Sequence, residues 1–247
     1  ILVGTMAFPA SAASTYTVGD YTYSVNGNTV TITSYNGSAT SVTLPTSVSI
    51  NNTTVEPNAV GNAAFADNKN LKTIVIPEQY TSLGNGAFRN CVNLSSITIN
   101  GNLDDLSSNS YYSNSGYDNY YSVFYNAGTG TNGITVTFGP KVKWVPAYLF
   151  ATGHDKIDGI YPNVKTVNLS SSIQVIKKAA FNRCFNLENV NFENAVSLTA
   201  INEEAFRYCS SLKTANLPVS VETIGDRAFV ECESLSSIII PEKNTKV

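Results

Sequence analysis

Apolar residues recur in a fixed frame along this chain, and a phenylalanine marks the same place in each unit. Seven phenylalanines occupy this place, at intervals of 23 to 36 residues: Phe65, Phe88, Phe124, Phe150, Phe181, Phe206 and Phe229. A unit of this length is too short to bury its apolar side alone, so each unit must stack on the next. The frame therefore predicts a solenoid built from consecutive coils.

Other positions keep constant offsets from the phenylalanine. An alanine usually precedes it directly, a leucine often lies six positions after it, and an aliphatic residue lies five positions before it. The aliphatic residues are Val60, Leu83, Val145, Ile176, Ile201 and Ile224. So many shared offsets indicate one fold for all the units.

The end of each unit reads L-x-x-I-x-I and is often followed by proline. In residues 71–77, Ile74 and Ile76 alternate with outward residues, which is the period of a β-strand, and Pro77 lacks the N–H that would continue the ladder. We expect one short parallel strand per coil, and a curved sheet on one side of the array. The segment around the phenylalanine is too short for an isolated helix, so a single helical or 3₁₀ turn is expected there.

Two units carry the clearest version of the repeat. Residues 83–99 read LGNGAFRNCVNLSSITI, and residues 224–241 read IGDRAFVECESLSSIIIP. This pattern resembles the BspA-like leucine-rich repeats of bacterial surface proteins, over residues 39–247. The resemblance implies a β-rich leucine-rich-repeat solenoid, a scaffold without a shared catalytic motif, and a role in adhesion or in recognition of host molecules.

The first 38 residues precede the repeat array. Residues 1–13, ILVGTMAFPASAA, resemble the end of a secretory signal peptide, with a short buried strand as the alternative, and they fall short of the roughly 20 apolar residues of a membrane span. Residues 14–38 alternate in polarity around Asn26-Gly27, which predicts a β-hairpin that caps the first coil. Since the sequence opens without methionine and stops inside a coil, both ends are expected to be cut.

The period breaks between Gly101 and Tyr121, where the sequence is rich in Ser, Asn and Tyr. Tyrosine combines a flat apolar ring with a hydroxyl, which suits contacts with sugars or proteins. The insertion is therefore a candidate binding loop, and the alternative is that some of its tyrosines pack over the widened coil as core. The tyrosines concerned are Tyr111, Tyr112, Tyr117, Tyr120 and Tyr121.

The strand residues expected to point away from the core form a second candidate surface. Such a face is the usual docking side of leucine-rich solenoids, although small polar residues there would also serve simply to keep the sheet soluble. The candidate ligand-binding residues on it are Thr73, Ser96, Thr98, Thr166, Asn189 and Thr214.

Four cysteines share one place, three residues after the phenylalanine: Cys91, Cys184, Cys209 and Cys232. Stacked coils would place equivalent residues roughly 5 Å apart, so the last three are within disulfide reach of a neighbour, whereas Cys91 has no cysteine in an adjacent coil. We expect buried, unreactive thiols, with one bridge among the last three as the alternative. A row of equivalent ligands does not form a tetrahedral metal site.

Composition and motifs narrow the class of function. With 43% apolar and 13% charged residues and a net charge of −3, the chain can build one continuous core but offers no basic face for nucleic acid. His154 is the only histidine, and no nucleophile elbow, zinc-protease helix or phosphate-binding loop is present. The Glu203-Glu204 pair is expected to be surface charge, and Asp104-Asp105 matches no known calcium loop.

These features predict an exported, non-enzymatic binding module, secreted or at the cell surface, that recognises a protein or a glycan. We expect no cofactor, no metal, no nucleic acid and no membrane insertion, and a monomeric solenoid. The alternative is a structural spacer or targeting region of a larger surface enzyme or anchored protein. A hydrolase that depends on His154 is the least favoured hypothesis.

Overall fold

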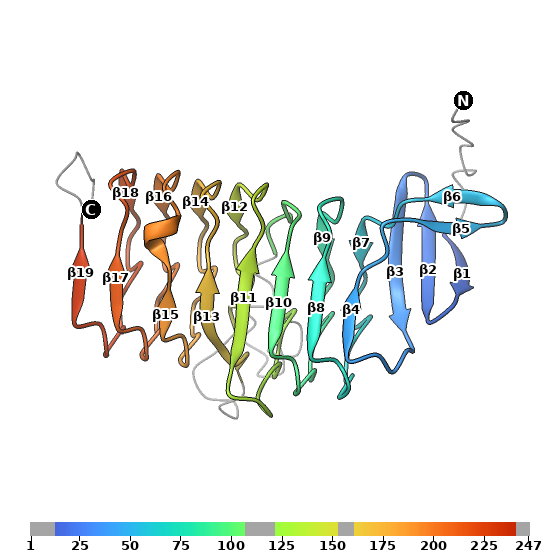
Figure 1. Cartoon of the computed structure of the whole chain (residues 1–247), viewed down its shortest axis with the longest axis horizontal. Helices are drawn as coiled ribbons and strands as arrows, with labels where there is room; N and C mark the ends of the chain where they lie inside the picture. Colours follow the sequence, from blue (N-terminus) through green and yellow to red (C-terminus); the bar gives the residue numbers. More distant parts are fainter. Residues whose placement is uncertain (1–12, 107–121, 153–160, 241–247) are drawn as a thin grey trace.

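The chain winds into a stack of coils with a wall of β-strands on each side. The structure, a computed structural model, describes residues 13–106, 122–152 and 161–240. The coils follow one another in sequence order along the long axis, from β1 to β19, and form a nearly straight row instead of the curved sheet that we expected (Figure 1).

The first wall is the parallel sheet predicted from the L-x-x-I-x-I segments. Six strands form it in the order β15-β13-β11-β10-β8-β4, and β17 and β19 pair beside it. We call the outward surface of these eight strands the long-strand face. Their bounds are β4 (Ser41–Thr43), β8 (Thr73–Ile76), β10 (Ser96–Ile99), β11 (Ile134–Phe138), β13 (Val164–Asn168), β15 (Asn189–Val190), β17 (Thr214–Asn216) and β19 (Ser237–Ile239).

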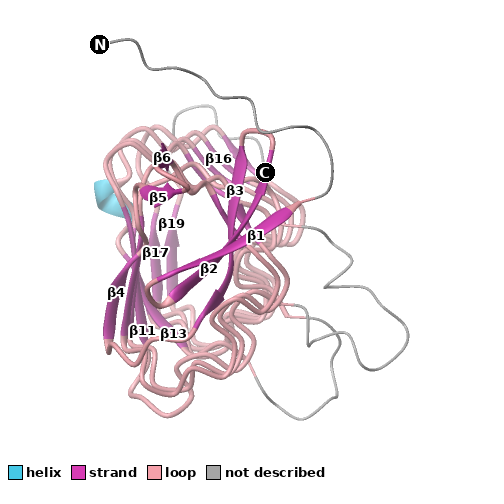
Figure 2. Cartoon of the chain, turned by 90° about the vertical axis from the view of Figure 1, so that its right-hand side faces the viewer, coloured by secondary structure: helices cyan, strands magenta, loops and turns pink. Residues whose placement is uncertain are grey.

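In the described residues, six of the coils have a second strand, and these strands form the opposite wall, so the expectation of one strand per coil was wrong. Each of these strands has two residues and ends on the aliphatic residue five positions before the phenylalanine. Figure 2 shows the two walls on opposite sides of the coils. A strand of two residues is too short to leave an alternating pattern in the sequence. The strands are β7 (Ala59–Val60), β9 (Ser82–Leu83), β12 (Trp144–Val145), β14 (Val175–Ile176), β16 (Ala200–Ile201) and β18 (Thr223–Ile224).

The segment around the phenylalanine is a hydrogen-bonded turn and not the helical or 3₁₀ turn that we expected. In the first coil, Phe65 donates its N–H to the carbonyl of Ala87 in the next coil (2.8 Å), whereas Ala66 donates to Ala63 in its own coil (3.0 Å). Successive N–H groups thus alternate between the two coils. Among the described residues the only 3₁₀ helix is η3 (Phe192–Asn194), at a different place in its coil.

Left-handed residues on both sides of the phenylalanine explain why the turn does not continue as a helix. A right-handed helix cannot include residues with positive φ, which cost about 1–2 kcal/mol each when they are not glycine. Two positions before the phenylalanine they are Ala63, Gly86, Tyr148, Ala179, Glu204 and Arg227, and two positions after it they are Asp67, Asn90, Asn126, Arg183, Tyr208 and Glu231.

The seven phenylalanines form one continuous aromatic stack, which confirms the predicted frame. Neighbouring ring centroids lie 4.9 to 5.7 Å apart, with interplanar angles of 8 to 25°. The first six rings are at most 1% exposed. Burial of each ring contributes about 1.5–3 kcal/mol, so the stack is a principal source of cohesion between coils.

The N-terminal cap contains the hairpin expected at Asn26-Gly27. Strands β2 (Tyr21–Asn26) and β3 (Thr29–Tyr35) pair antiparallel, and Gly27 has a φ of +57°, as the tight turn requires. β1 (Ser14–Val18) adds a third antiparallel strand, and β3 pairs parallel with β7, so the cap merges into the second wall. A small hairpin that we did not predict, β5 (Val48–Ile50) with β6 (Thr53–Val55), follows the cap.

The four cysteines occupy one position of the coil, as predicted, and all are free thiols. Each Sγ donates a hydrogen bond to the carbonyl of the phenylalanine in the preceding coil, for example from Cys91 to Phe65 (3.1 Å) and from Cys209 to Phe181 (3.3 Å). Burial raises the pKa of Cys91 to about 12 and that of Cys232 to about 11. The thiols therefore act as small side chains that link one coil to the next, buried in Cys91, Cys184 and Cys209 and half-buried in Cys232.

Candidate ligand-binding face

The outward side chains of the long-strand face form two rows, because residues paired across parallel strands stand side by side. The inward residues between them are buried, so the alternation decides which side chains reach solvent. The first row runs through Ser41, Thr73, Ser96, Thr135, Thr166 and Asn189. The second row, two residues further along each strand, runs through Thr43, Val75, Thr98, Thr137 and Asn168. We call these two rows the polar ladder.

The structure brings all six predicted strand residues onto this face. Thr98 lies in the second row, Thr214 lies on β17 opposite Ser237, and the other four lie in the first row: Thr73, Ser96, Thr166 and Asn189. Strand β17 and its partner β19 extend the surface beyond the six-stranded sheet.

Sequence reasoning missed the two threonines of β11, Thr135 and Thr137, which lie at the centre of the polar ladder. Their coil lacks the leucine six positions after its phenylalanine, and none of the candidate ligand-binding residues lay on its strand. The alternation of Ile134, Val136 and Phe138, all buried, was the signal that could have found them.

Most hydroxyls of the polar ladder are free to bind a ligand. Within the described residues, the side chains of Thr73, Ser96, Thr98, Thr135 and Thr166 have no hydrogen-bond partner in the protein. One contact exists inside the ladder, from Asn168 Nδ2 to Thr137 Oγ1 (3.3 Å). Since a hydroxyl both donates and accepts, the face can match either kind of polar group.

Charged residues line the two edges of the face and pair with one another. At the edge where the strands begin, Glu188 lies between Lys213 (2.8 Å), which precedes β17, and Lys165 (3.1 Å), the second residue of β13. Hydrogen bonds from Lys213 and Lys165 lower the pKa of Glu188. After the strands, Lys141 pairs with Glu78 at 2.7 Å. The rows themselves carry no charge, so the face is neutral between two paired edges.

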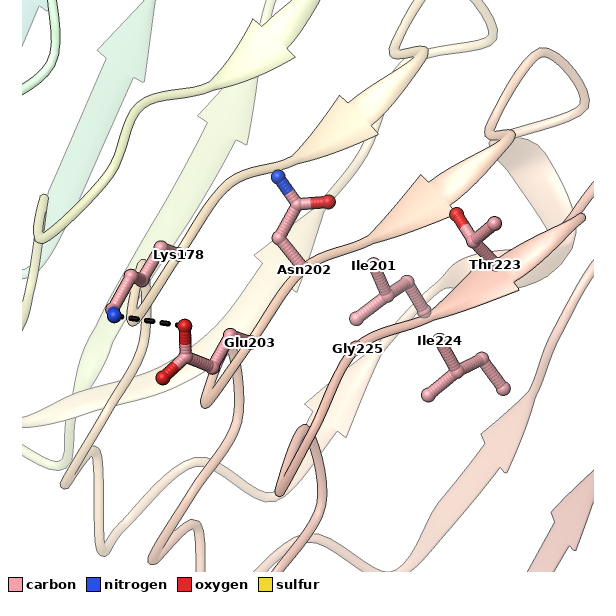
Figure 3. Close-up of a pocket in the computed structure, with 7 residues that line it drawn as sticks. All are labelled: Lys178, Ile201, Asn202, Glu203, Thr223, Ile224 and Gly225. Carbon is pink, nitrogen blue, oxygen red and sulfur yellow. Dashed lines mark hydrogen bonds and ion pairs between the residues drawn. The ribbon is translucent and has the colours of Figure 1, made fainter. Parts of the chain in front are cut away.

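A groove of about 530 Å³ lies on the opposite wall, between β16 and β18 (Figure 3). Gly225 lines this groove, and its missing side chain matters because a Cβ there would collide with the backbone nitrogen of Glu203. Thr223 and Asn202 supply polar groups, while Glu203 is held by Lys178 at 2.8 Å. With its one carboxylate already paired, this groove offers fewer free groups than the polar ladder.

The carboxylates singled out in the sequence serve structural contacts. The expectation of surface charge was wrong for Glu204, which is 3% exposed and pairs with Arg207 at 2.8 Å. Glu204 has a left-handed φ, like the equivalent residues Ala63 and Arg227, but those two side chains are exposed, so the backbone conformation alone does not bury it. Asp105 accepts the N–H of Ala147 (3.1 Å) and pairs with Lys177 (2.9 Å).

No group of three or more histidine, cysteine, aspartate or glutamate side chains suited to a metal ion occurs among the residues that the structure describes. No helix in this described part is long and apolar enough to cross a membrane. Several predictions lie outside the described residues: the signal-like segment 1–12, His154, and the tyrosines Tyr111, Tyr112, Tyr117, Tyr120 and Tyr121.

The chain is similar to solved structures of bacterial proteins. A leucine rich cell surface protein from Faecalibacterium prausnitzii A2-165 is 24% identical with a TM-score of 0.51, over 92% of this chain and 55% of that chain. The pneumococcal vaccine antigen PcpA is 18% identical with a TM-score of 0.48, over 94% of this chain and 51% of that one. This chain thus spans about half the length of both proteins.

The repeat frame identifies the family. No curated protein matches the chain. The family described as "BspA type Leucine rich repeat region" matches residues 35–152 and 161–247, with six copies. These residues contain the phenylalanine stack, the cysteine row and the polar ladder. The chain belongs to the BspA-type leucine-rich-repeat family.

Proposed function

We propose that this protein is an exported, non-enzymatic binding module of a cell surface, which acts in adhesion or in recognition of host proteins or glycans. Its membership of a repeat family supports a binding role, and the F. prausnitzii protein of the same fold is described as a cell surface protein. The observation that carries the proposal is the polar ladder, with its in-register hydroxyls that have no partner among the described residues.

The rigidity of the array favours binding by this face. The strands that carry the ladder are held by buried inward residues and by the phenylalanine stack behind them. Because the hydroxyls are already in place, a partner does not have to order a flexible segment when it binds. A rigid surface can therefore recognise a partner through many weak polar contacts.

Substitutions that add bulk and charge to the ladder test this proposal. Thr98→Arg and Thr166→Arg place a long cation on the neutral face, and we expect at least tenfold weaker binding to extracellular matrix proteins or surface glycans, measured by surface plasmon resonance. Thr223→Arg on the opposite wall is the matched control, with binding retained. Binding that survives both ladder variants, with melting temperatures unchanged, would remove this face from the proposal.

The tyrosine insertion is a second part of the proposed binding surface. Tyrosine rings offer large contact area at low entropic cost, so Tyr111, Tyr112 and Tyr117 are proposed to add to the affinity. We expect the triple alanine variant to bind more weakly while its thermal unfolding stays the same. Equal binding by the variant would limit the proposal to the strand face.

The second candidate function is a spacer or targeting region within a larger surface enzyme or anchored protein. The stacked coils support this function, because each coil contacts the next one in sequence order and the array forms a stiff rod. The two functions differ in one measurement: a spacer would bind none of the matrix proteins or glycans as an isolated chain. Binding by the isolated chain that the ladder variants abolish would exclude the spacer as its sole role.

A further inference from the structure

The polar ladder repeats along one direction with a constant step. Each of the six strands contributes one residue to the first row and all but β15 contribute one to the second, and adjacent parallel strands lie about 4.7–4.9 Å apart. The two rows are two residues apart along the strands, or about 6.6 Å. The face is thus a lattice of hydrogen-bonding groups whose long direction follows the axis of the array, and Figure 1 shows that axis to be nearly straight.

The chemistry of the ladder selects an uncharged, polar ligand. Ten of its eleven positions carry a hydroxyl or an amide, and Val75 is the exception. No aromatic or charged side chain stands in these rows. Of the flanking lysines, Lys141, Lys165 and Lys213 pair with glutamates, whereas the exposed Lys72 before β8 has no ion pair among the described residues. Protein interfaces usually depend on a few aromatic or arginine anchors, which the ladder lacks. A ligand that makes the same small polar contact at every coil fits better.

We propose that the polar ladder binds a neutral, linear polysaccharide, which lies across the strands along the axis with one sugar unit per coil. An extended chain of equatorially linked pyranose rings advances by about one strand spacing per sugar, so each ring lies over one coil; because successive rings are turned over, the same edge of the sugar recurs at every second coil. The inference rests on the proposed binding function and names the ligand class for the strand face. The six strands of the continuous sheet give room for six sugars.

The edges of the face fit this orientation. The Lys165–Glu188–Lys213 cluster lies where the strands begin, with Lys165 inside β13, and the Glu78–Lys141 pair follows the strands, so charged side chains border the ladder on both sides. A chain that ran along the strands would cross these edges, whereas a chain that follows the axis stays over the neutral rows. The straight array requires no bend of the polymer.

Oligosaccharides of increasing length test the proposal. The panel consists of cello-, chito-, xylo- and manno-oligosaccharides of two to six sugars, titrated by calorimetry against the whole chain. For at least one series we expect affinity to rise with each added sugar up to six, because each coil adds equivalent contacts. Absence of binding to every series, or preference for charged alginate or heparin, would overturn the proposal.

Isosteric variants locate the site. Thr98→Val, Thr135→Val and Thr166→Val together remove three unpartnered hydroxyls without changing side-chain size, and we expect affinity to fall roughly 30-fold. The control is Thr223→Val on the opposite wall, which should leave affinity unchanged. Oligosaccharide binding that the triple variant retains would also overturn the proposal.

The experiments distinguish failure of the polysaccharide proposal from failure of the proposed binding function. If the ladder variants weaken binding of a matrix protein while no oligosaccharide binds, the polysaccharide is wrong and the binding module remains. If the chain binds neither class of ligand, both proposals fail.

Discussion

The two ends of the described aromatic stack differ in the residues that pack against them. At the N-terminal end, Tyr35 lies 4.9 Å from Phe65 and Tyr21 lies 4.9 Å from Tyr35, so the first phenylalanine is only 1% exposed. At the last described coil, Phe229 contacts Phe206 at 5.3 Å but is only partly buried, and Ile238 nearby is 39% exposed. The contribution of a repeat phenylalanine to stability should thus depend on its neighbours, as expected for a fold stabilised by nearest-neighbour contacts.

The largest expected effect on stability comes from removing one ring in the middle of the stack. Removal of a ring at the end of the stack provides the comparison. Phe150 lies between rings at 4.9 and 5.7 Å and is fully buried, so Phe150→Ala should lower the free energy of unfolding by about 3–5 kcal/mol. Phe229→Ala, with one stacking neighbour and partial burial, should cost about 1–2 kcal/mol.

Urea unfolding followed by circular dichroism measures this difference. Phe185→Ala is the control, since Phe185 lies outside the stack and is partly buried. Equal losses for Phe150→Ala and Phe229→Ala would mean that the position of a ring in the stack does not determine its contribution.

The next effect concerns the cap. Tyr35 joins the hairpin to the stack through its ring, so Tyr35→Ala should cost about 2–4 kcal/mol, whereas Tyr35→Phe keeps the ring and should change stability by less than about 1 kcal/mol. Hydrogen exchange should show faster opening of the Phe65 coil in the alanine variant than of the Phe181 coil. Uniform acceleration along the chain would contradict a local role for the cap.

Alkaline pH should act on the capped end through its buried tyrosines. Burial raises the pKa of Tyr21 and Tyr23 from the ordinary value of 10.0 to about 12. Below pH 10 both residues are protonated in the folded and the unfolded chain, so they leave stability unchanged. As pH rises from 10 towards 12, the unfolded chain ionises first, and the free energy of unfolding should fall.

Urea midpoints between pH 9 and 11.5 measure this fall. The buried thiols act in the same direction, because the pKa of Cys91 is raised from 9.0 to about 12. The double variant Tyr21→Phe and Tyr23→Phe separates the two contributions and should flatten the part of the curve above pH 10. A curve that the double variant does not alter would assign the effect to the thiols and to Tyr80, whose pKa burial also raises.

Much of this fold follows from apolar spacing. The phenylalanine frame, the cysteine position and the outward side of Thr73, Ser96 and Thr166 could be predicted, because each depends on a side chain that recurs at a fixed offset. The second wall could not be predicted, because a strand of two residues such as Val175–Ile176 leaves no periodic signal.

The geometry of the turns could not be predicted from the sequence either. Alanine normally avoids positive φ, yet Ala63 and Ala179 both have a φ of +53° because inter-coil hydrogen bonds fix the backbone. The pair of buried Glu204 and partly buried Arg207 could not be separated from surface charge in the sequence, because the equivalent position is exposed in some coils, such as that of Arg227. The ligand of the polar ladder is not encoded by any single residue, so it remains a proposal from the arrangement of the whole face.

The smallest expected effect on stability is a difference between the first coil, beside the cap, and the second coil. At the same position of the turn the first coil has Ala63, exposed and at φ +53°, and the second has Gly86, buried and at φ +60°. Left-handed alanine costs about 1–2 kcal/mol, while glycine raises the entropy of the unfolded chain by about 0.5–1 kcal/mol. Ala63→Gly should therefore stabilise the protein by about 0.5 kcal/mol, and Gly86→Ala should destabilise it by about 1 kcal/mol or more.

Ala66→Gly is the matched control for this comparison, because Ala66 belongs to the same turn as Ala63 but is not among the residues with positive φ. With no strain to relieve, this substitution should cost about 0.5–1 kcal/mol in the same urea titration. Opposite signs for Ala63→Gly and Ala66→Gly would place backbone strain in the first coil, next to the best-covered end of the stack. Equal losses for the two variants would mean that the inter-coil hydrogen bonds hold Ala63 without measurable strain.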